Sequence, residues 1–198
     1  MLGKRQRVLK RLFDLSFSIL LLPFAIFPLI LMLLIAWFST GESGLFVQER
    51  IGRFGKHFKL FKIRSLKGKW HNDAHEIQQN ETSFGRWIRK SKLDELPQLF
   101  NVLNGDMSWV GPRPDLPGYA DKLQGDDQII LKVRPGITGP ATIKYKNEDA
   151  LLLQQTNPNW YNDHVIWPDK VRINKDYIAN WSFKKDLFYL MSSIFNVK

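Results

Sequence analysis

The sequence has no cysteine among its 198 residues. A disulfide framework and a metal site built on thiolates are therefore excluded. The sequence also lacks a P-loop, a GxGxxG fingerprint and a GxSxG elbow, so the common patterns of nucleotide-binding folds and serine hydrolases do not apply. We find no internal repeat and no low-complexity tract. Function must therefore be inferred from charge, hydrophobic runs and a few short motifs.

Acidic residues are scarce: 19 Asp and Glu face 29 Lys and Arg, which gives a formal net charge of +10 at pH 7. Such an excess suits polyanionic partners, among them nucleic acid, anionic lipid headgroups and nucleotide or phosphate substrates. No recognisable nucleic-acid-binding motif accompanies the charge. We therefore expect membrane lipids and phosphate compounds as partners, and no nucleic acid.

Charge is missing altogether from residues 15–38, an apolar run near the N-terminus. A hydrocarbon core of about 30 Å requires roughly 20 helical residues, so the run is long enough to cross it. A cleaved signal peptide fits poorly, because the run is too long and no small-residue cleavage site follows it. The run predicts insertion into a membrane.

The flanks of this run and two prolines bear on its topology. Basic residues cluster on both sides, at 4–11 and 50–64, whereas a spanning helix prefers them on the cytoplasmic side alone. Pro23 and Pro28 each remove a backbone hydrogen bond near the middle. A helix-break-helix that enters and leaves by the same face explains both observations; an ordinary span with tolerated prolines is the alternative. We expect a re-entrant membrane hairpin over 1–40 and a separate domain over 41–198.

The domain over 41–198 has mixed composition and predicts an α+β fold that is mostly helical. Short strands at 46–49 and 57–63 would form a small β-hairpin around the turn at 52–55. Residues 67–82 are polar and predict a loop. Helices are expected at 84–90, 148–155, 175–181 and 184–195. The last two are amphipathic, and their aromatic residues fit either the core or an interfacial position at the lipid headgroups.

Two smaller features of this domain invite a structural prediction. His71 and His75 are four residues apart in the polar loop, a spacing that zinc sites use. No HExxH pattern and no third ligand accompany them, so we do not expect metal there. Further on, Pro135-Gly136 fits the centre of a type II turn that would present Arg134.

The most informative stretch is 92–114, which contains the adjacent carboxylates Asp94 and Glu95. Leucine and phenylalanine at 96, 99, 100 and 103 form one apolar helical stripe. Asp94 stands where an N-cap belongs, Pro97 falls in the first turn, and Gly105 is placed to end the helix. One interpretation is that the two acids only cap and stabilise a helix start. The other is that they handle a metal ion and a phosphate.

Cations around the pair favour the second interpretation, because guanidinium groups match phosphate bidentately. Arg89 precedes the acids, and Arg113 follows in a rigid Gly-Pro-Arg-Pro turn. The candidate substrate-binding residues are Lys59, Lys62, Arg64, Arg89, Arg113 and Arg134.

Taken together, these motifs resemble the bacterial sugar transferases, the monotopic polyprenol-phosphate phosphoglycosyl transferases that start capsule, O-antigen and related glycans. The resemblance runs along nearly the whole chain. It rests on KRLFD at 10–14, FVQERIG at 46–52, FKLFKIRS at 58–65, the stretch 93–114, RPGITG at 134–139 and NWS at 180–182.

The resemblance implies transfer of a sugar-1-phosphate, usually from a UDP-sugar, to undecaprenyl phosphate, with release of UMP. It implies that Asp94 is the nucleophile and that Glu95, together with Asp94, holds Mg²⁺. It also implies a place at the bacterial inner membrane, with a catalytic domain over 41–198 on the cytoplasmic face. The oligomeric state stays open, a homo-oligomer included.

The chain departs from the family pattern in three places. Phe27-Pro28 stands where many members have Ser-Pro, and Pro140-Ala141-Thr142 replaces a common Trp-Ala-Gln. Asn174 appears where some members carry an aspartate. These departures leave open which sugar is transferred and whether a third acidic residue takes part.

Overall fold

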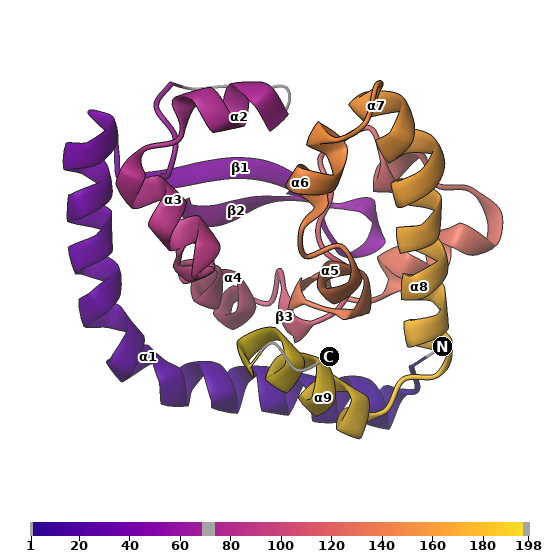
Figure 1. Ribbon diagram of the computed structural model, residues 1–198. Coiled ribbons are helices and arrows are strands. Elements are labelled where there is room, and N and C mark those ends of the chain that lie inside the picture. The colour runs from indigo at the N-terminus through magenta and orange to yellow at the C-terminus, as the bar shows by residue number, and fades with distance from the viewer. Residues whose placement is uncertain (1, 69–73, 196–198) are drawn as a thin grey trace.

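The computed structural model describes residues 2–68 and 74–195, and it shows a mostly helical α+β chain (Figure 1). The fold class predicted from the sequence is confirmed at this level. In chain order the elements are α1 (Lys4–Thr40), β1 (Leu45–Ile51), η1 (Arg53–Gly55), β2 (His57–Ile63), α2 (Ala74–Asn80), α3 (Ser83–Lys90), η2 (Leu93–Glu95), α4 (Gln98–Asn104), β3 (Ser108–Val110), η3 (Ala120–Lys122), η4 (Gly125–Lys132), β4 (Gly136–Thr138), α5 (Pro140–Lys144), α6 (Glu148–Leu153), α7 (Pro158–Tyr161), η5 (Asn162–Ile166), α8 (Trp167–Ala179) and α9 (Phe183–Phe195).

The apolar run lies within one long helix, α1, which changes direction partway along (Figure 1). Pro23 and Pro28 lie inside this helix, and each lacks the N–H that a helical hydrogen bond needs. Prolines are a common cause of such bends. The predicted helix-break-helix is therefore a bend within a continuous helix. By length and composition α1 could cross a membrane; its re-entry stays a prediction.

Both arms of α1 pack on the rest of the chain, whereas large side chains in its middle are exposed. Leu29, Met32 and Ala36 are buried in a cluster with side chains of β2 and α3. Phe24 and Phe27, close to the two prolines, are each 75% exposed. An apolar surface of this kind is unfavourable in water and suits lipid. It continues along the C-terminal arm of α1 through exposed Ile30, Leu31 and Phe38.

The predicted β-hairpin is confirmed, and both strands have seven residues. β1 and β2 pair antiparallel from Leu45 opposite Ile63 to Ile51 opposite His57. The turn between them is the short helix η1, in which Phe54 adopts a left-handed φ of 60°.

A second, two-stranded sheet was not predicted. β3 and β4 pair in parallel, with Ser108 opposite Gly136 and Val110 opposite Thr138. The predicted type II turn at Pro135-Gly136 is wrong, because such a turn needs a left-handed φ that Gly136 lacks. A glycine is needed for packing instead: a Cβ on Gly136 would lie 2.1 Å from the backbone nitrogen of Gly111. The two backbones therefore approach more closely than any side chain allows.

The polar stretch predicted as a loop at 67–82 contains the helix α2. That prediction is wrong in this part, because a short polar helix gives no apolar stripe to recognise. His71 of the candidate histidine pair lies outside the described residues.

The two C-terminal helices follow the prediction in outline. The helix predicted at 175–181 is the end of the longer α8, and the one at 184–195 is α9. The aromatic residues divide between the two alternatives. Trp181 is buried in the main core, whereas Phe188 and Phe195 are 55% and 64% exposed.

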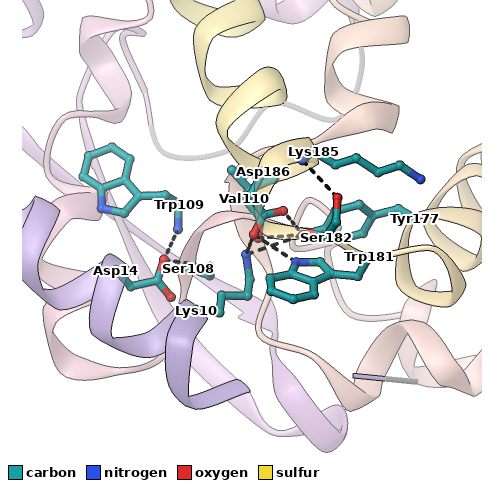
Figure 2. A network of polar contacts seen from close by, with 10 residues as sticks. All are labelled: Lys10, Asp14, Ser108, Trp109, Val110, Tyr177, Trp181, Ser182, Lys185 and Asp186. Atoms are coloured by element: carbon teal, nitrogen blue, oxygen red, sulfur yellow. Dashed lines mark hydrogen bonds and ion pairs between the residues drawn. The ribbon is translucent and has the colours of Figure 1, made fainter. Parts of the chain in front are cut away.

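A buried polar network joins α1 and α9 to the small parallel sheet (Figure 2). Asp186 of α9 accepts hydrogen bonds from Lys10 Nζ at 2.5 Å, Tyr177 OH at 2.6 Å and Trp181 Nε1 at 3.0 Å. One turn along α1 from Lys10, Asp14 Oδ1 accepts bonds from the hydroxyl of Ser108 and the backbone N–H of the next residue, the first two residues of β3. The network fixes both helices against the strand that leads to Arg113.

Candidate active site

The two adjacent carboxylates lie on a tight turn and not at the start of an α-helix. The backbone at Lys92 is left-handed with φ 60°, and residues 93–95 form the 3-10 turn η2. The next helix, α4, begins only at Gln98, with Pro97 at its N-cap and no side-chain cap. The prediction that Asp94 caps a helix is therefore wrong, while Gly105 does end α4 in a left-handed conformation. Asp94 and Glu95 are both buried.

Two cations hold Glu95. Its Oε1 lies 2.5 Å from Arg113 Nη2 and 3.5 Å from Lys62 Nζ. Burial alone would raise the pKa of Glu95, but the charges of Arg113 and Lys62 outweigh it and lower the pKa to about 2. Glu95 is therefore an anion throughout the physiological range, and in turn it raises the pKa of Arg113.

Asp94 differs from its neighbour because its carboxylate forms no hydrogen bond or ion pair within residues 2–68 and 74–195. Its Oδ1 is buried without a hydrogen bond. Burial raises the pKa of Asp94, Lys62 acts to lower it, and the adjacent negative charge of Glu95 raises it again. A desolvated carboxylate with a free oxygen is more basic and more nucleophilic than one in water.

Arg113 owes its position to the small parallel sheet. It follows Gly111 and Pro112, which continue from the end of β3. The N–H of Gly111 donates to Thr138 O at 2.9 Å, and the N–H of Gly136 donates to Pro112 O at 2.8 Å. The backbone just before the guanidinium group is thereby clamped to β4, which makes the contact with Glu95 a rigid one.

Lys62 owes its position to an asparagine that joins β2 to α4. Asn101 is fully buried, donates from Nδ2 to Lys59 O at 2.7 Å and accepts from the N–H of Phe61 at 3.1 Å. β2 pairs with β1 along one edge, and on its other edge Asn101 satisfies these two backbone groups as a neighbouring strand would. Sequence reasoning missed Asn101, because an asparagine inside an apolar stripe carries no signal of its own.

Sequence reasoning also missed two further charged residues near Asp94 and Glu95. Arg50 donates from Nη2 to Gln48 Oε1 at 2.6 Å and from Nη1 to Pro114 O at 3.4 Å. Burial lowers the pKa of Arg50 to about 10, and Arg113 contributes to that shift. Burial also raises the pKa of Asp115 to about 6, against the lowering effect of Lys170 and Arg50. Two features of the sequence could have pointed to them. Side chains alternate between the two faces along β1, which contains Arg50, and Asp115 directly follows the Gly-Pro-Arg-Pro turn.

The structure brings only some of the predicted residues together. Asp94, Glu95, Lys62 and Arg113 form one cluster, which we call the dyad centre. Arg89 is close enough to lower the pKa of Asp94, but its own ion pairs join it to Glu81 at 3.3 Å and Asp149 at 3.0 Å.

Three predicted cations contact other groups. Lys59 is exposed on β2. Arg64 pairs with Glu42 at 3.1 Å. Arg134 donates to Gly105 O at 2.7 Å, at the far end of α4 from the dyad. A role for these three in substrate binding stays a prediction.

The donor atoms at the dyad fit a magnesium ion shared with a substrate. Mg²⁺ is usually held by one or two carboxylates, waters and substrate phosphates. Within the described residues Asp94 Oδ1 has no hydrogen-bond partner, and the ion pairs of Glu95 with Arg113 and Lys62 fall on Oε1, which leaves Oε2 for a further ligand. Within residues 2–68 and 74–195 no group of three or more His, Asp or Glu side chains could hold a metal alone. The phosphates of a substrate would have to complete the site.

Asn174, where an acid was considered, is buried in α8 with an unpartnered Oδ1. Pro140, which stands where many members of the family have tryptophan, begins α5.

Comparison with known proteins places this geometry in context. The family model described as bacterial sugar transferase matches residues 5–198. The uncharacterized sugar transferase EpsL of Bacillus subtilis is 34% identical, over 94% of this chain and 86% of its own length. The undecaprenyl-phosphate galactose phosphotransferase of Salmonella typhimurium is 32% identical over 97% of this chain, and the undecaprenyl-phosphate glucose phosphotransferase of Komagataeibacter xylinus is 40% identical over 93%. The chain spans only 41% and 35% of the length of these last two proteins.

Proposed function

The chain belongs to the bacterial sugar transferase family, and from this we propose that it transfers a sugar-1-phosphate from a UDP-sugar to undecaprenyl phosphate. The products would be undecaprenyl-diphosphate-sugar and UMP. Such a transfer starts the synthesis of a surface glycan such as a capsule, an O-antigen, an exopolysaccharide or a glycoprotein. The observation that carries the proposal is the buried, unpartnered Asp94 Oδ1 beside the cations that hold Glu95.

In the first step an oxygen of Asp94 attacks the β-phosphorus of the donor. The bond from this phosphorus to the oxygen that bridges to the α-phosphate breaks, and that oxygen leaves with the electron pair as part of UMP. Asp94 then carries the sugar phosphate as an acyl phosphate. A carboxylate needs no general base for this attack, because it carries no proton that must be removed.

In the second step a phosphate oxygen of undecaprenyl phosphate attacks the same phosphorus. The bond to Asp94 breaks, and the carboxylate is regenerated. Arg113 and Lys62 offset the negative charge that gathers in both steps, since both reactants are anions. Mg²⁺, held by Asp94 and Glu95, would supply further neutralisation of the donor's phosphates when bound.

The membrane features suit a lipid acceptor. α1 has an exposed apolar middle, and α9 exposes apolar side chains on the face opposite Asp186 and Leu190. We propose that α1 re-enters the membrane. The residues before the apolar run and the domain over 41–198 would then both lie on the cytoplasmic face. A cysteine placed at Arg5 would then resist a membrane-impermeant thiol reagent in intact cells. Labelling from outside would contradict re-entry, and the absence of native cysteine leaves no background.

The reaction is tested with the purified full chain, Mg²⁺, undecaprenyl phosphate and a panel of UDP-sugars. We expect UMP release with at least one donor. Without the acceptor, intact-protein mass spectrometry should show the added mass of one sugar phosphate, and Asp94→Asn should show none. An adduct that persists in Asp94→Asn would place the nucleophile elsewhere. UMP release without any adduct would favour direct transfer.

A further inference from the structure

Four arginines gather where the N-terminal arm of α1 meets the hairpin turn and the end of α4. They are Arg7, Arg11, Arg53 and Arg134, and we call them the arginine cluster. Their charges are not used by the dyad centre, because none of the four contacts Asp94 or Glu95 within the described residues.

Two members of the cluster converge on the C-terminal end of α4. Arg11 donates from Nη1 to Val102 O at 2.6 Å and from Nη2 to Leu103 O at 2.9 Å. Arg134 donates from Nε to Gly105 O at 2.7 Å. A Cβ on Gly105 would lie 3.5 Å from Arg11 Nη2 and 4.0 Å from Arg134 Nη2. Helix C-terminal carbonyls therefore hold two guanidinium groups side by side.

The other two members are electrostatically coupled to this pair. Arg53, in the hairpin turn, donates from Nε to Lys132 O at 3.2 Å. Burial lowers the pKa of Arg53, and the charges of Arg134 and Arg7 lower it further. Like charges at this range repel one another, so their arrangement costs free energy unless an anion is present.

The protein supplies no such anion in the part that the structure describes. Arg64, Arg89 and Arg113 each form an ion pair with a carboxylate, but no member of the cluster does within residues 2–68 and 74–195. Asp14 acts on Arg11 at longer range, and its Oδ1 already accepts two hydrogen bonds from β3. The cluster is thus rich in donors and poor in acceptors.

The position on α1 indicates the source of the anion. Arg7 and Arg11 are one helical turn apart, and the side of the helix at Lys10 is buried in the domain. Val8 and Leu12 follow the two arginines and are 53% and 58% exposed. Arginines on such a border reach the headgroup level while apolar neighbours enter the lipid.

We propose that the arginine cluster binds the phosphate of an anionic membrane phospholipid, at a site separate from the dyad centre. Guanidinium groups bind phosphate oxygens in pairs, and basic clusters next to a membrane helix attract anionic headgroups. The bound lipid would relieve the repulsion among the four arginines and fasten the hairpin turn to α1. This inference goes beyond the proposed transfer reaction and does not depend on it.

The test measures binding of short-chain phosphatidylglycerol and phosphatidylcholine to the full chain in a neutral detergent, without donor or acceptor. We expect a preference for phosphatidylglycerol that Arg7→Gln/Arg53→Gln lowers about 10-fold. These two residues are chosen because they do not hold the end of α4. Lys184→Gln/Lys185→Gln is the matched control: it removes the same charge from exposed positions on α9 and should change the preference less than about twofold.

Two results would overturn the proposal. One is a preference that survives in the cluster variant or falls equally in the control, because the attraction would then be unspecific. The other is inorganic phosphate binding as tightly as phosphatidylglycerol, which would make the site one for a free phosphate. Thermal unfolding of both variants should match that of the unchanged protein, and a charge-retaining Arg7→Lys/Arg53→Lys variant should keep most of the preference.

Discussion

Asp94 and Asp186 are both buried aspartates, but their surroundings are opposite. Asp186 receives hydrogen bonds from Lys10, Tyr177 and Trp181, so its charge is fully compensated (Figure 2). Asp94 has one oxygen without any partner, and burial raises its pKa. Buried polar groups are nearly always satisfied, so an unsatisfied one points to a function and a satisfied one to the fold.

The same contrast exists within the dyad. Glu95 is ion-paired with Arg113 and Lys62 and has a pKa of about 2, whereas the adjacent Asp94 is not directly paired. By residue type and spacing alone the two acids are equivalent, and only the family resemblance separates their expected roles. Their environments differ: Glu95 is held by two cations, whereas Oδ1 of Asp94 stays open for the nucleophilic role that we propose.

The largest expected effect on activity follows Asp94→Asn. We expect UMP release to fall by about 10³-fold or more, since the nucleophile is lost. Stability should not fall, because a desolvated charge is removed and no hydrogen bond to Oδ1 is broken. UMP release and thermal unfolding in detergent measure the two quantities. A large drop in unfolding temperature would show that Asp94 is structural, like Asp186.

The reverse is expected of Asp186→Asn. The substitution leaves the buried Lys10 charge without its partner, which costs about 3–5 kcal/mol. Denaturant unfolding measures this loss of stability. The double variant Lys10→Met/Asp186→Leu removes both charges and should recover part of it. If the double variant is as unstable as the single one, packing and not charge compensation explains the effect.

Asp115 tests whether a raised pKa near the dyad makes the stability of the fold depend on pH. Its pKa is 3.8 ordinarily and about 6 in the folded chain. The group therefore adds stability that is fully present below pH 3.8 and is lost as the pH rises through 6. Asp115→Asn should remove this dependence and raise stability at neutral pH by about 3 kcal/mol. Unfolding free energies measured across this pH range check it; equal slopes in both proteins would contradict it.

The smallest effect compares two lysines of β2. Lys62 lies 3.5 Å from Glu95, whereas Lys59 is exposed. Lys62→Met should lower the rate of UMP release about 10-fold, and Lys59→Met less than about twofold. Steady-state rates at saturating donor decide between them. If both variants lose the rate of UMP release to a similar extent, Lys59 contacts a substrate in the complex, although it is exposed in the free chain.

Local patterns predicted the elements that rest on local contacts. The hairpin, the helix at 84–90 and the C-terminal helix all occur close to the expected bounds. Long-range pairing was not predictable: β3 and β4 are three residues each and pair across a stretch that includes η3 and η4. Strands this short give no periodic signal, and their partners are chosen by the packing of the whole chain.

The candidate site divides in the same way. The stretch 92–114, the cations around it and the resemblance to a family together predicted Asp94, Glu95 and Arg113 as site residues, and the structure brings these three together. Lys62 was one of six candidate cations, and the pairing of β2 with β1 and with Asn101 of α4 brings it to Glu95. Arg134 was predicted there as well, and it lies with Arg11 instead.

The sequence by itself determined the family and the long apolar helix, and it predicted the residues proposed to handle phosphate, since these follow from residue type, run length and motif order. Only the tertiary structure decided which acid is ion-paired, which keeps an open oxygen, and which cations lie beside them. The physical reason is that pKa and nucleophilicity depend on burial and on charges brought in from distant segments. Asp94 is distinguished from Glu95 by what β2 and the strand before Arg113 place beside each of them.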